Sequence, residues 1–167
     1  MHRKLERLID LEDLPRLVRG LRSAGSTIVT TNGSFDLIHV GHVHYLAEAR
    51  AQGDVLILGL NSDSSIRRNK GPARPINTEL HRAEVLLSLR SVDYVSLFDE
   101  AVPIRFIETA APDVHVNGAE YGRDCVEATT VARLGARLHL VPRNNVLSTT
   151  LLVERILKAC AGSQGTP

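Results

Sequence analysis

Apolar and polar residues alternate along the chain in blocks that predict strands and helices in turn. Short runs of apolar or β-branched residues predict five strands, at 27–31, 54–60, 93–98, 114–116 and 136–141. Apolar residues at helical spacing predict helices around these strands, at 43–52, after a cap at Thr78, and at 103–110, 125–134 and 149–159. The continuous apolar run at 54–60 is typical of a strand that is buried on both faces.

Five strands that alternate with helices imply a single doubly wound parallel sheet with helices on both faces, which is a Rossmann-like α/β fold. In such sheets, ligands bind beyond the carboxyl ends of the strands, where the strand order reverses. Functional residues are therefore expected in the loops after the first, fourth and fifth strands. The expected domain covers 25–160, an amphipathic helix within 1–24 packs against the sheet edge, and 161–167 form a frayed tail.

Composition limits the classes of function that the chain can serve. Its 167 residues are enough for one domain with a sizeable core. A formal net charge of +1 and an aromatic content of 4% argue against a nucleic acid or an anionic membrane surface as partner. No apolar run approaches the ~20 residues that span a bilayer. The charged N-terminus does not resemble a signal peptide, and Cys125 and Cys160 lack neighbours at metal-ligand spacing, so a cytoplasmic protein is expected.

The strongest functional signal follows the first predicted strand, where residues 31–42 read TNGSFDLIHVGH. A helix that begins here presents free backbone N–H groups and a positive dipole end, both of which suit a phosphate. Gly33 permits a tight turn or a close ligand approach, and His39 and His42 lie three residues apart, so both can face one point. Two such imidazoles indicate a metal site or an oxyanion site. Asp36 is the only close third ligand and the spacing matches no zinc motif, which favours hydrogen bonds to a phosphate.

The order of motifs along the chain resembles the HxGH nucleotidyltransferase superfamily, in its cytidylyltransferase-like branch. After His39-Val40-Gly41-His42, motifs follow in the expected order at 61–63, 70–71, 74–76, 82–84, 92–93, 98–100 and 148–150. The nearest resemblance is to heptose-1-phosphate adenylyltransferases. It implies an enzyme that joins the nucleoside monophosphate of ATP or CTP to a phosphorylated small molecule and releases pyrophosphate, with Mg²⁺ as cofactor.

The resemblance also implies a role for each matching residue. His39 and His42 would stabilise the α-phosphate, and Lys70, in a flexible basic loop at 67–71, would reach the phosphates. Nucleotide binding is expected from Asn32, Gly33, Ser34, Phe35, Gly41, Asn117, Gly118, Tyr121, Arg143, Ser148, Thr149 and Thr150. Acceptor binding is expected from Asp36, Asn61 and Arg82, with surface ion pairs as the alternative role of Arg82. No residue is assigned as a metal ligand.

Two positions leave the substrate open. Asn117 stands where heptose adenylyltransferases usually have the lysine of Lys-Gly-Gly-Asp-Tyr, and Arg143 is spaced like an arginine of a cytidylyltransferase signature. The first hypothesis is an adenylyltransferase that makes ADP-heptose from ATP and D-glycero-D-manno-heptose 1-phosphate. The second is a CTP-dependent cytidylyltransferase for a polyol phosphate or a small phosphonate such as 2-hydroxyethylphosphonate. The third is a non-catalytic nucleotide-binding domain. The resemblance is also compatible with a homodimer.

Overall fold

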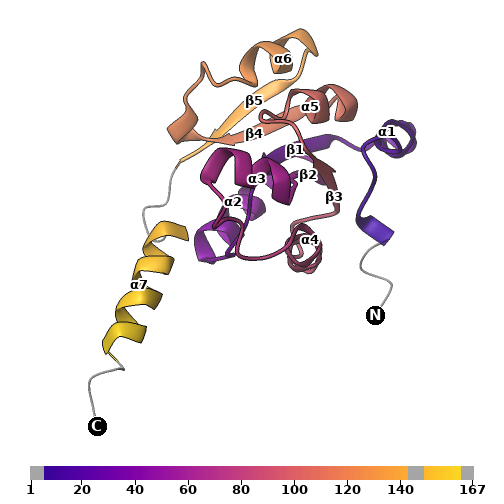
Figure 1. Cartoon of the computed structure of the whole chain (residues 1–167). Coiled ribbons are helices and arrows are strands. Elements are labelled where there is room, and N and C mark those ends of the chain that lie inside the picture. Colours follow the sequence, from indigo (N-terminus) through magenta and orange to yellow (C-terminus); the bar gives the residue numbers. More distant parts are fainter. Residues whose placement is uncertain (1–5, 143–148, 163–167) are drawn as a thin grey trace.

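The computed structural model describes residues 6–142 and 149–162, and its centre is a sheet of five parallel strands in the order β3-β2-β1-β4-β5 (Figure 1). The strands are β1 (Ile28–Gly33), β2 (Val55–Asn61), β3 (Tyr94–Phe98), β4 (Val114–Gly118) and β5 (Arg137–Val141). The helices are α1 (Leu14–Ser23), α2 (Val40–Arg50), α3 (Asp63–Lys70), α4 (Glu79–Leu87), α5 (Ile104–Ala110), α6 (Ala128–Arg133) and α7 (Thr149–Gly162). The Rossmann-like α/β fold predicted from the sequence is therefore confirmed.

Each face of the sheet carries its own apolar core. On one face, Leu46 of α2 and Leu86 of α4 pack on strand residues such as Leu58. On the other face the core combines residues of α1, α5 and α6 with alternate strand residues: Leu14, Val18, Ile28, Ile57, Phe106, Ile107 and Val131. Because successive strand residues point to opposite faces, two apolar layers form from one set of continuous apolar strands.

The position of α1 differs from the sequence-based expectation. The helix packs on a face of the sheet beside α5 and β1, and not against the sheet edge. The reason is that Leu14 and Val18 are apolar enough to join the core, where they are 0% and 5% exposed. The residues before the helix reach the edge instead, since Leu8 forms a parallel bridge with Val95 of β3.

Helix α3 was not predicted, because residues 67–71 were interpreted as a flexible basic loop. The helix begins after Ser62, whose hydroxyl accepts a hydrogen bond from the backbone N–H of Ser65. Its first turn contains Asp63 and its last turn contains basic residues, which complements the helix dipole. It is followed by the C-cap residue Gly71, whose φ of 90° is rare for other residues. Lys70 is thus the last residue of a capped helix.

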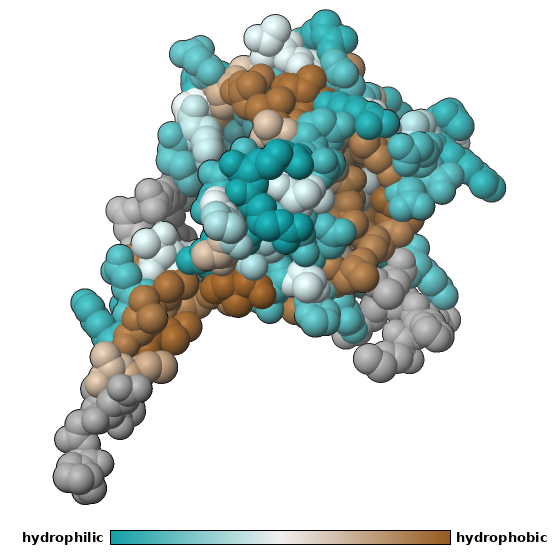
Figure 2. All heavy atoms as spheres, in the orientation of Figure 1, coloured by the Kyte–Doolittle hydropathy of each residue, from teal (hydrophilic) through white to brown (hydrophobic). Residues whose placement is uncertain are grey.

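The remaining element boundaries shift by a few residues. Helix α2 begins three residues earlier than expected and includes Gly41 and His42, whereas α6 begins three residues later, at Ala128. Strand β1 continues through Gly33, and α7 continues to Gly162. Helix α7 extends away from the sheet, and apolar side chains gather along it (Figures 1 and 2). Among the described helices, none has the length and apolar character that a bilayer crossing requires.

Strands β1 and β4 separate toward their carboxyl ends. Strand β1 pairs with β2 from Ile28 to Gly33, but its pairing with β4 stops after Thr30 and His115. Beyond that point the hydroxyl of Tyr45 lies between the strands, 2.6 Å from Thr31 Oγ1 and 3.1 Å from the carbonyl oxygen of Val116. The strand order reverses at this same place, so the fold opens a gap where a ligand is expected.

Candidate active site

A cavity of about 1030 Å³ runs along the carboxyl ends of the strands. It is lined by residues at the carboxyl ends of the five strands and in the loops after β1, β3 and β4, together with residues of α2, α3 and α7. Among the predicted site residues, those that line it are Asn32, Gly33, Ser34, Phe35, Asp36, His39, Gly41, His42, Asn61, Lys70, Asn117, Gly118, Tyr121, Thr149 and Thr150. Arg82 does not line it, and Arg143 and Ser148 lie outside the described residues.

His39 and His42 form a stacked pair at the start of α2. His39 is the N-cap residue, and the two ring centroids are 3.9 Å apart with an angle of 24° between the rings. The Nδ1 atoms of both rings are buried without a hydrogen-bond partner. Burial lowers the pKa of His39 and lowers that of His42 to about 4, with the nearby His39 and Lys70 adding to the effect on His42. Both rings are therefore neutral at pH 7, and each carries one N–H donor. A backbone hydrogen bond of the His42 ring with Leu37 opposes part of the fall of its pKa.

Phe35 supports this pair from the side of β1. Its backbone has a φ of 42°, which turns the chain so that the ring lies 5.2 Å from the His42 ring, centroid to centroid. The ring also lies against Gly33, where an added Cβ would be 2.8 Å from Phe35 Cε2. Gly33 is thus required for the close approach of Phe35. Phe35 is only 7% exposed, so it limits the movement of the His42 ring.

Asp36 anchors the loop between α3 and α4. Its carboxylate accepts hydrogen bonds from the backbone N–H groups of Ile76 and Asn77, each at 2.9 Å, and from Arg74 at 3.2 Å. Burial raises the pKa of Asp36, but these hydrogen bonds outweigh it and hold the pKa below its ordinary value. The loop places Arg74 in the wall of the cavity, close to Lys70. Arg74 is a cavity cation to which the sequence analysis gave no role.

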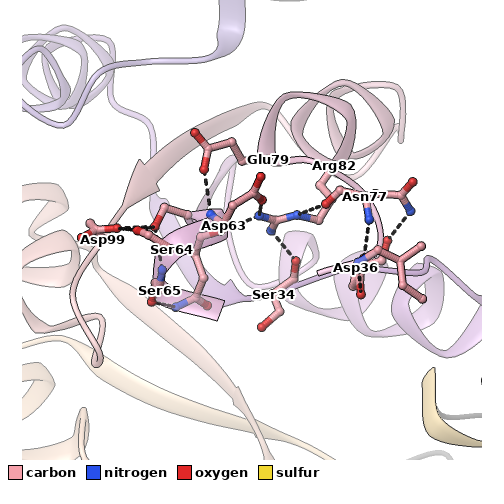
Figure 3. A network of polar contacts seen from close by, with 12 residues as sticks. Ser34, Asp36, Asp63, Ser64, Ser65, Asn77, Glu79, Arg82 and Asp99 are labelled. Carbon is pink, nitrogen blue, oxygen red and sulfur yellow. Dashed lines mark hydrogen bonds and ion pairs between the residues drawn. The ribbon is translucent and has the colours of Figure 1, made fainter. Parts of the chain in front are cut away.

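Arg82 is the centre of the polar network in Figure 3. Its side chain is fully buried and forms an ion pair of 2.8 Å with Asp63. Its other hydrogen bonds go to backbone carbonyl oxygens, at 2.7 Å to Ser34, 2.9 Å to Asn61 and 3.1 Å to Asn77. The alternative role of Arg82, in surface ion pairs, is therefore wrong. The guanidinium instead ties the ends of β1 and β2 to α3 and to the loop that Asp36 holds.

Further contacts fix the start of α3. Glu79 accepts a hydrogen bond of 2.7 Å from the backbone N–H of Asp63, and Asp99 accepts hydrogen bonds from Ser62 and Ser64. A helix held at its start carries Lys70 at its end, in the wall of the cavity. Partial burial lowers the pKa of the Lys70 ammonium; Asp36 opposes this, and the positive charges of Arg74 and Arg82 add to it.

The wall of the cavity beyond β4 contains a buried carboxylate that the sequence analysis missed. Glu127 is 6% exposed and accepts a hydrogen bond of 3.3 Å from Asn117 Nδ2. Asn117 is also 6% exposed, and its Oδ1 accepts a hydrogen bond of 3.0 Å from the Gly118 N–H. The only signal in the sequence was the position of Glu127 inside the predicted helix at 125–134. The structure places Glu127 before α6, as its N-cap residue.

This fold is that of the nucleotidyltransferase superfamily that the HxGH motif indicated. A family model described as cytidylyltransferase-like matches residues 30–155, so the chain belongs to the cytidylyltransferase-like family. Two curated relatives are the bifunctional protein HldE of Syntrophotalea carbinolica, 47% identical over 152 residues, and that of Geobacter metallireducens, 46% identical over 156 residues. These matches cover 87% and 90% of this chain, but 30% and 31% of the relatives, so the chain spans about a third of their length.

Solved structures show the same relationship. A lipopolysaccharide core biosynthesis protein from Thermoplasma volcanium superposes with a TM-score of 0.58 and 31% identity, over 72% of this chain and 98% of that chain. A pantoate-beta-alanine ligase from Francisella tularensis also superposes with a TM-score of 0.58, at 13% identity, over 81% of this chain and 67% of that chain. The second likeness is one of fold alone. The resemblance stated from the sequence is thus confirmed at the level of the family.

Proposed function

We propose that this chain is an adenylyltransferase that converts ATP and D-glycero-D-manno-heptose 1-phosphate to ADP-heptose and pyrophosphate. One observation carries the proposal. Among the described residues, five buried side-chain atoms lack a hydrogen-bond partner, and three of them belong to residues that line this one cavity: Asn32 Oδ1, His39 Nδ1 and His42 Nδ1. An unpaired buried polar atom costs about 1–3 kcal/mol, so three of them gathered at one cavity mark a place where the fold gives up stability, as functional sites do.

The proposed chemistry is an in-line displacement at the α-phosphorus of ATP. An anionic phosphate oxygen of the acceptor forms the new bond, and the bond from the α-phosphorus to the bridging oxygen of pyrophosphate breaks. The attacking oxygen is already deprotonated, so the reaction needs no general base. Catalysis then depends on positioning and on stabilising the charge of the transition state. The neutral imidazoles of His39 and His42 would donate hydrogen bonds to the non-bridging oxygens, and Lys70 and Arg74 would supply positive charge.

The two ends of the cavity suit the two substrates differently. The end near β2 and α3 has the cations Lys70 and Arg74 and the amide of Asn61, which suit a phosphorylated polyol. The end near β4 and β5 has apolar or flat surfaces, contributed by Tyr121, Val126, Val141 and Pro142. Such surfaces suit the planar face of a nucleobase. We therefore place the base near β4 and β5, with the histidine pair between it and the acceptor.

Mg²⁺ would enter with the triphosphate. In the described ranges, no group of three or more His, Cys, Asp and Glu residues could hold a metal ion. The carboxylate of Asp36, which lies beside the histidines in sequence, already holds Arg74 and the loop. Mg²⁺ is often held by substrate phosphates with water and few protein ligands, which is compatible with this wall of the cavity. The ion would neutralise charge on the departing pyrophosphate.

The similarity to HldE proteins and to a lipopolysaccharide core biosynthesis protein supports a sugar phosphate as the acceptor. ATP is the nucleotide that the resemblance to heptose adenylyltransferases implies. Since ATP and sugar phosphates are metabolites of the cytoplasm, the proposal places the reaction there.

Pyrophosphate release tests the proposed function. The purified protein is incubated with each of ATP, CTP, GTP and UTP, together with heptose 1-phosphate, glycerol 3-phosphate or 2-hydroxyethylphosphonate. We expect release of pyrophosphate with ATP and heptose 1-phosphate, and ADP-heptose as the second product. A preference for CTP with another acceptor would contradict the assignment of substrates. Binding of nucleotide without pyrophosphate from any pair would contradict catalysis itself.

A further inference from the structure

The cavity wall at the end of β4 contains a carboxylate and a carboxamide in fixed relative positions. Asn117 and Glu127 are both 6% exposed, and both line the cavity. The hydrogen bond from the Gly118 N–H to Asn117 Oδ1 sets the orientation of the amide, so that Nδ2 faces Glu127. A flip of the Asn117 amide, which would exchange its oxygen and its nitrogen, would therefore break a buried hydrogen bond.

Hydrogen-bonding capacity remains on both side chains. An amide nitrogen has two hydrogens, and Asn117 uses one of them for Glu127. An ionised carboxylate has about four acceptor sites. Within the described part of the chain, the contacts of the Glu127 carboxylate are with Asn117 and with the thiol of Cys125. Burial and Glu127 raise the pKa of this thiol, and the Asn117 side chain, which also contacts it, opposes the rise. Among the residues described, the second hydrogen of the Asn117 amide has only this thiol, a weak acceptor, as its neighbour. The pair thus offers a ligand one donor, from Asn117, beside one acceptor, from Glu127.

The ligand group that meets this pair is uncharged. A buried carboxylate repels a phosphate in a low dielectric, so the phosphates belong beside the histidines and Lys70. The neighbours of the pair in the cavity wall include Tyr121 and Val126, which suit the flat face of a base. An adenine ring presents an exocyclic amino group as a donor and the adjacent ring nitrogen as an acceptor. These two groups match Glu127 and Asn117 in order.

We propose that Glu127, held by Asn117, recognises the exocyclic amino group of the nucleobase and selects ATP against nucleotides that carry a carbonyl oxygen there. This rests on the proposed function, in that the cavity binds a nucleoside triphosphate. Hypoxanthine, the base of ITP, reverses both groups: its carbonyl oxygen faces the carboxylate, and its ring N–H faces the amide N–H. Both hydrogen bonds are then replaced by repulsive contacts.

The departure of Asn117 from the relatives' pattern has a physical meaning in this arrangement. A lysine at this position would place an ammonium beside Glu127, and the resulting ion pair would occupy the carboxylate oxygens. Asparagine leaves those oxygens able to accept a hydrogen bond from the ligand. Asparagine at this position therefore leaves the pair able to distinguish an amino group from a carbonyl.

Calorimetric binding of ATP and of ITP, without acceptor, tests the inference independently of turnover. We expect the wild-type protein to bind ATP roughly 100-fold more tightly than ITP, because two hydrogen bonds are reversed. In Glu127→Gln, the new carboxamide can donate its N–H to the carbonyl oxygen of hypoxanthine. The ratio of ATP to ITP affinity should then fall below about tenfold. Asn117→Lys should lower the ratio too. Circular dichroism melting shows whether each variant is folded. If a variant does not fold, the ratio of ATP to ITP affinity in the wild-type protein tests the inference.

Glu120→Gln is the matched control. Glu120 also lines the cavity, and its change to Gln removes the same charge as Glu127→Gln does. Unlike Glu127, it is exposed, and its carboxylate lies over Gly118. The ratio of ATP to ITP affinity should stay as in the wild type. Equal affinity of the wild-type protein for ATP and ITP, or undiminished discrimination in folded Glu127→Gln, would overturn the inference. Absence of pyrophosphate release with intact discrimination would contradict only the proposed reaction.

Discussion

The hydroxyl of Tyr45 donates a hydrogen bond of 3.1 Å to the backbone carbonyl oxygen of Val116. Tyr45 belongs to α2 and Val116 to β4, and the same hydroxyl is 2.6 Å from Thr31 Oγ1 of β1. A side chain thus occupies the place where backbone pairing between β1 and β4 has stopped. The contact satisfies a carbonyl that the separated strands leave unpaired, and it links the helix of the histidine pair to both strands.

Tyr45→Phe should therefore destabilise the fold and leave the ring packing in place. The loss should be about 1–3 kcal/mol, because the Val116 carbonyl keeps its burial and loses its partner. Urea unfolding followed by circular dichroism measures this change. Tyr94→Phe is the control, since the Tyr94 hydroxyl has no hydrogen bond among the described residues. A free energy of unfolding in Tyr45→Phe that equals the wild-type value would show that the hydroxyl is not a structural link.

The histidine pair should matter for turnover more than for stability. If the proposed reaction holds, His42→Ala should lower kcat about 100- to 1000-fold, the range for loss of one donor to a transition-state oxyanion. Among the described residues, His42 Nδ1 has no hydrogen-bond partner, so the internal polar contact that the change removes is the one between the ring and the Leu37 backbone. Steady-state pyrophosphate release measures kcat, with His81→Ala on the exposed face of α4 as control. A kcat within threefold of the wild type would remove His42 from the catalytic step.

Stability should fall as the pH is lowered from about 6.5 to 4. Burial lowers the pKa of His42 and that of His115 to about 4 each, from an ordinary value of 6.5. The unfolded chain therefore binds more protons in this window, so the free energy of unfolding rises with pH through it. Each group contributes up to about 3 kcal/mol.

Urea unfolding at several pH values measures this dependence. His42→Ala should retain a shallower slope, because His115 and His39, whose pKa burial also lowers, remain. Asp36 has a lowered pKa, so its contribution is lost only below about pH 4 and does not affect the window. A wild-type stability that is constant from pH 6.5 to 4 would contradict the buried, neutral state of both imidazoles.

Arg82 should be the most costly of the site residues to change. Arg82→Met leaves the carboxylate of Asp63 and three backbone carbonyls without their partner, and loss of one member of a buried ion pair costs about 3–5 kcal/mol. Asp63→Asn in the same chain should recover part of this loss. The exposed Arg105→Met, whose ion pairs are with Glu12 and Glu100, should change stability by less than about 1 kcal/mol. Denaturant midpoints compare the three variants.

The sequence predicted the features that depend on neighbours along the chain. Alternating apolar blocks indicate the layered α/β fold, since each block must bury one face. The spacing of His39 and His42 brings their rings together on one helix turn, wherever that helix packs. The order of motifs was enough to identify the family, and the cavity lining agrees with most of the expected positions. The roles of these residues in binding and catalysis remain predictions.

Other features depend on residues that are distant in the chain. The partners of Arg82 come from a loop, a strand end and two further segments, so its burial could not be seen from its place on an amphipathic helix. Helix α3 is short and largely polar, so its stability depends on contacts with Glu79 and Asp99 as much as on its own cap. The pairing of Asn117 with Glu127 requires the chain to return to β4 after the turn that follows it.

The sequence by itself determined the fold class, the family and the pair of imidazoles at the start of α2, because periodicity and short spacings are local properties. Only the tertiary structure decided that Asp36 and Arg82 hold the site together and that Glu127 lines it. A side chain becomes a support or a recognition group through the atoms that burial places around it, and those atoms come from segments that the chain order keeps apart.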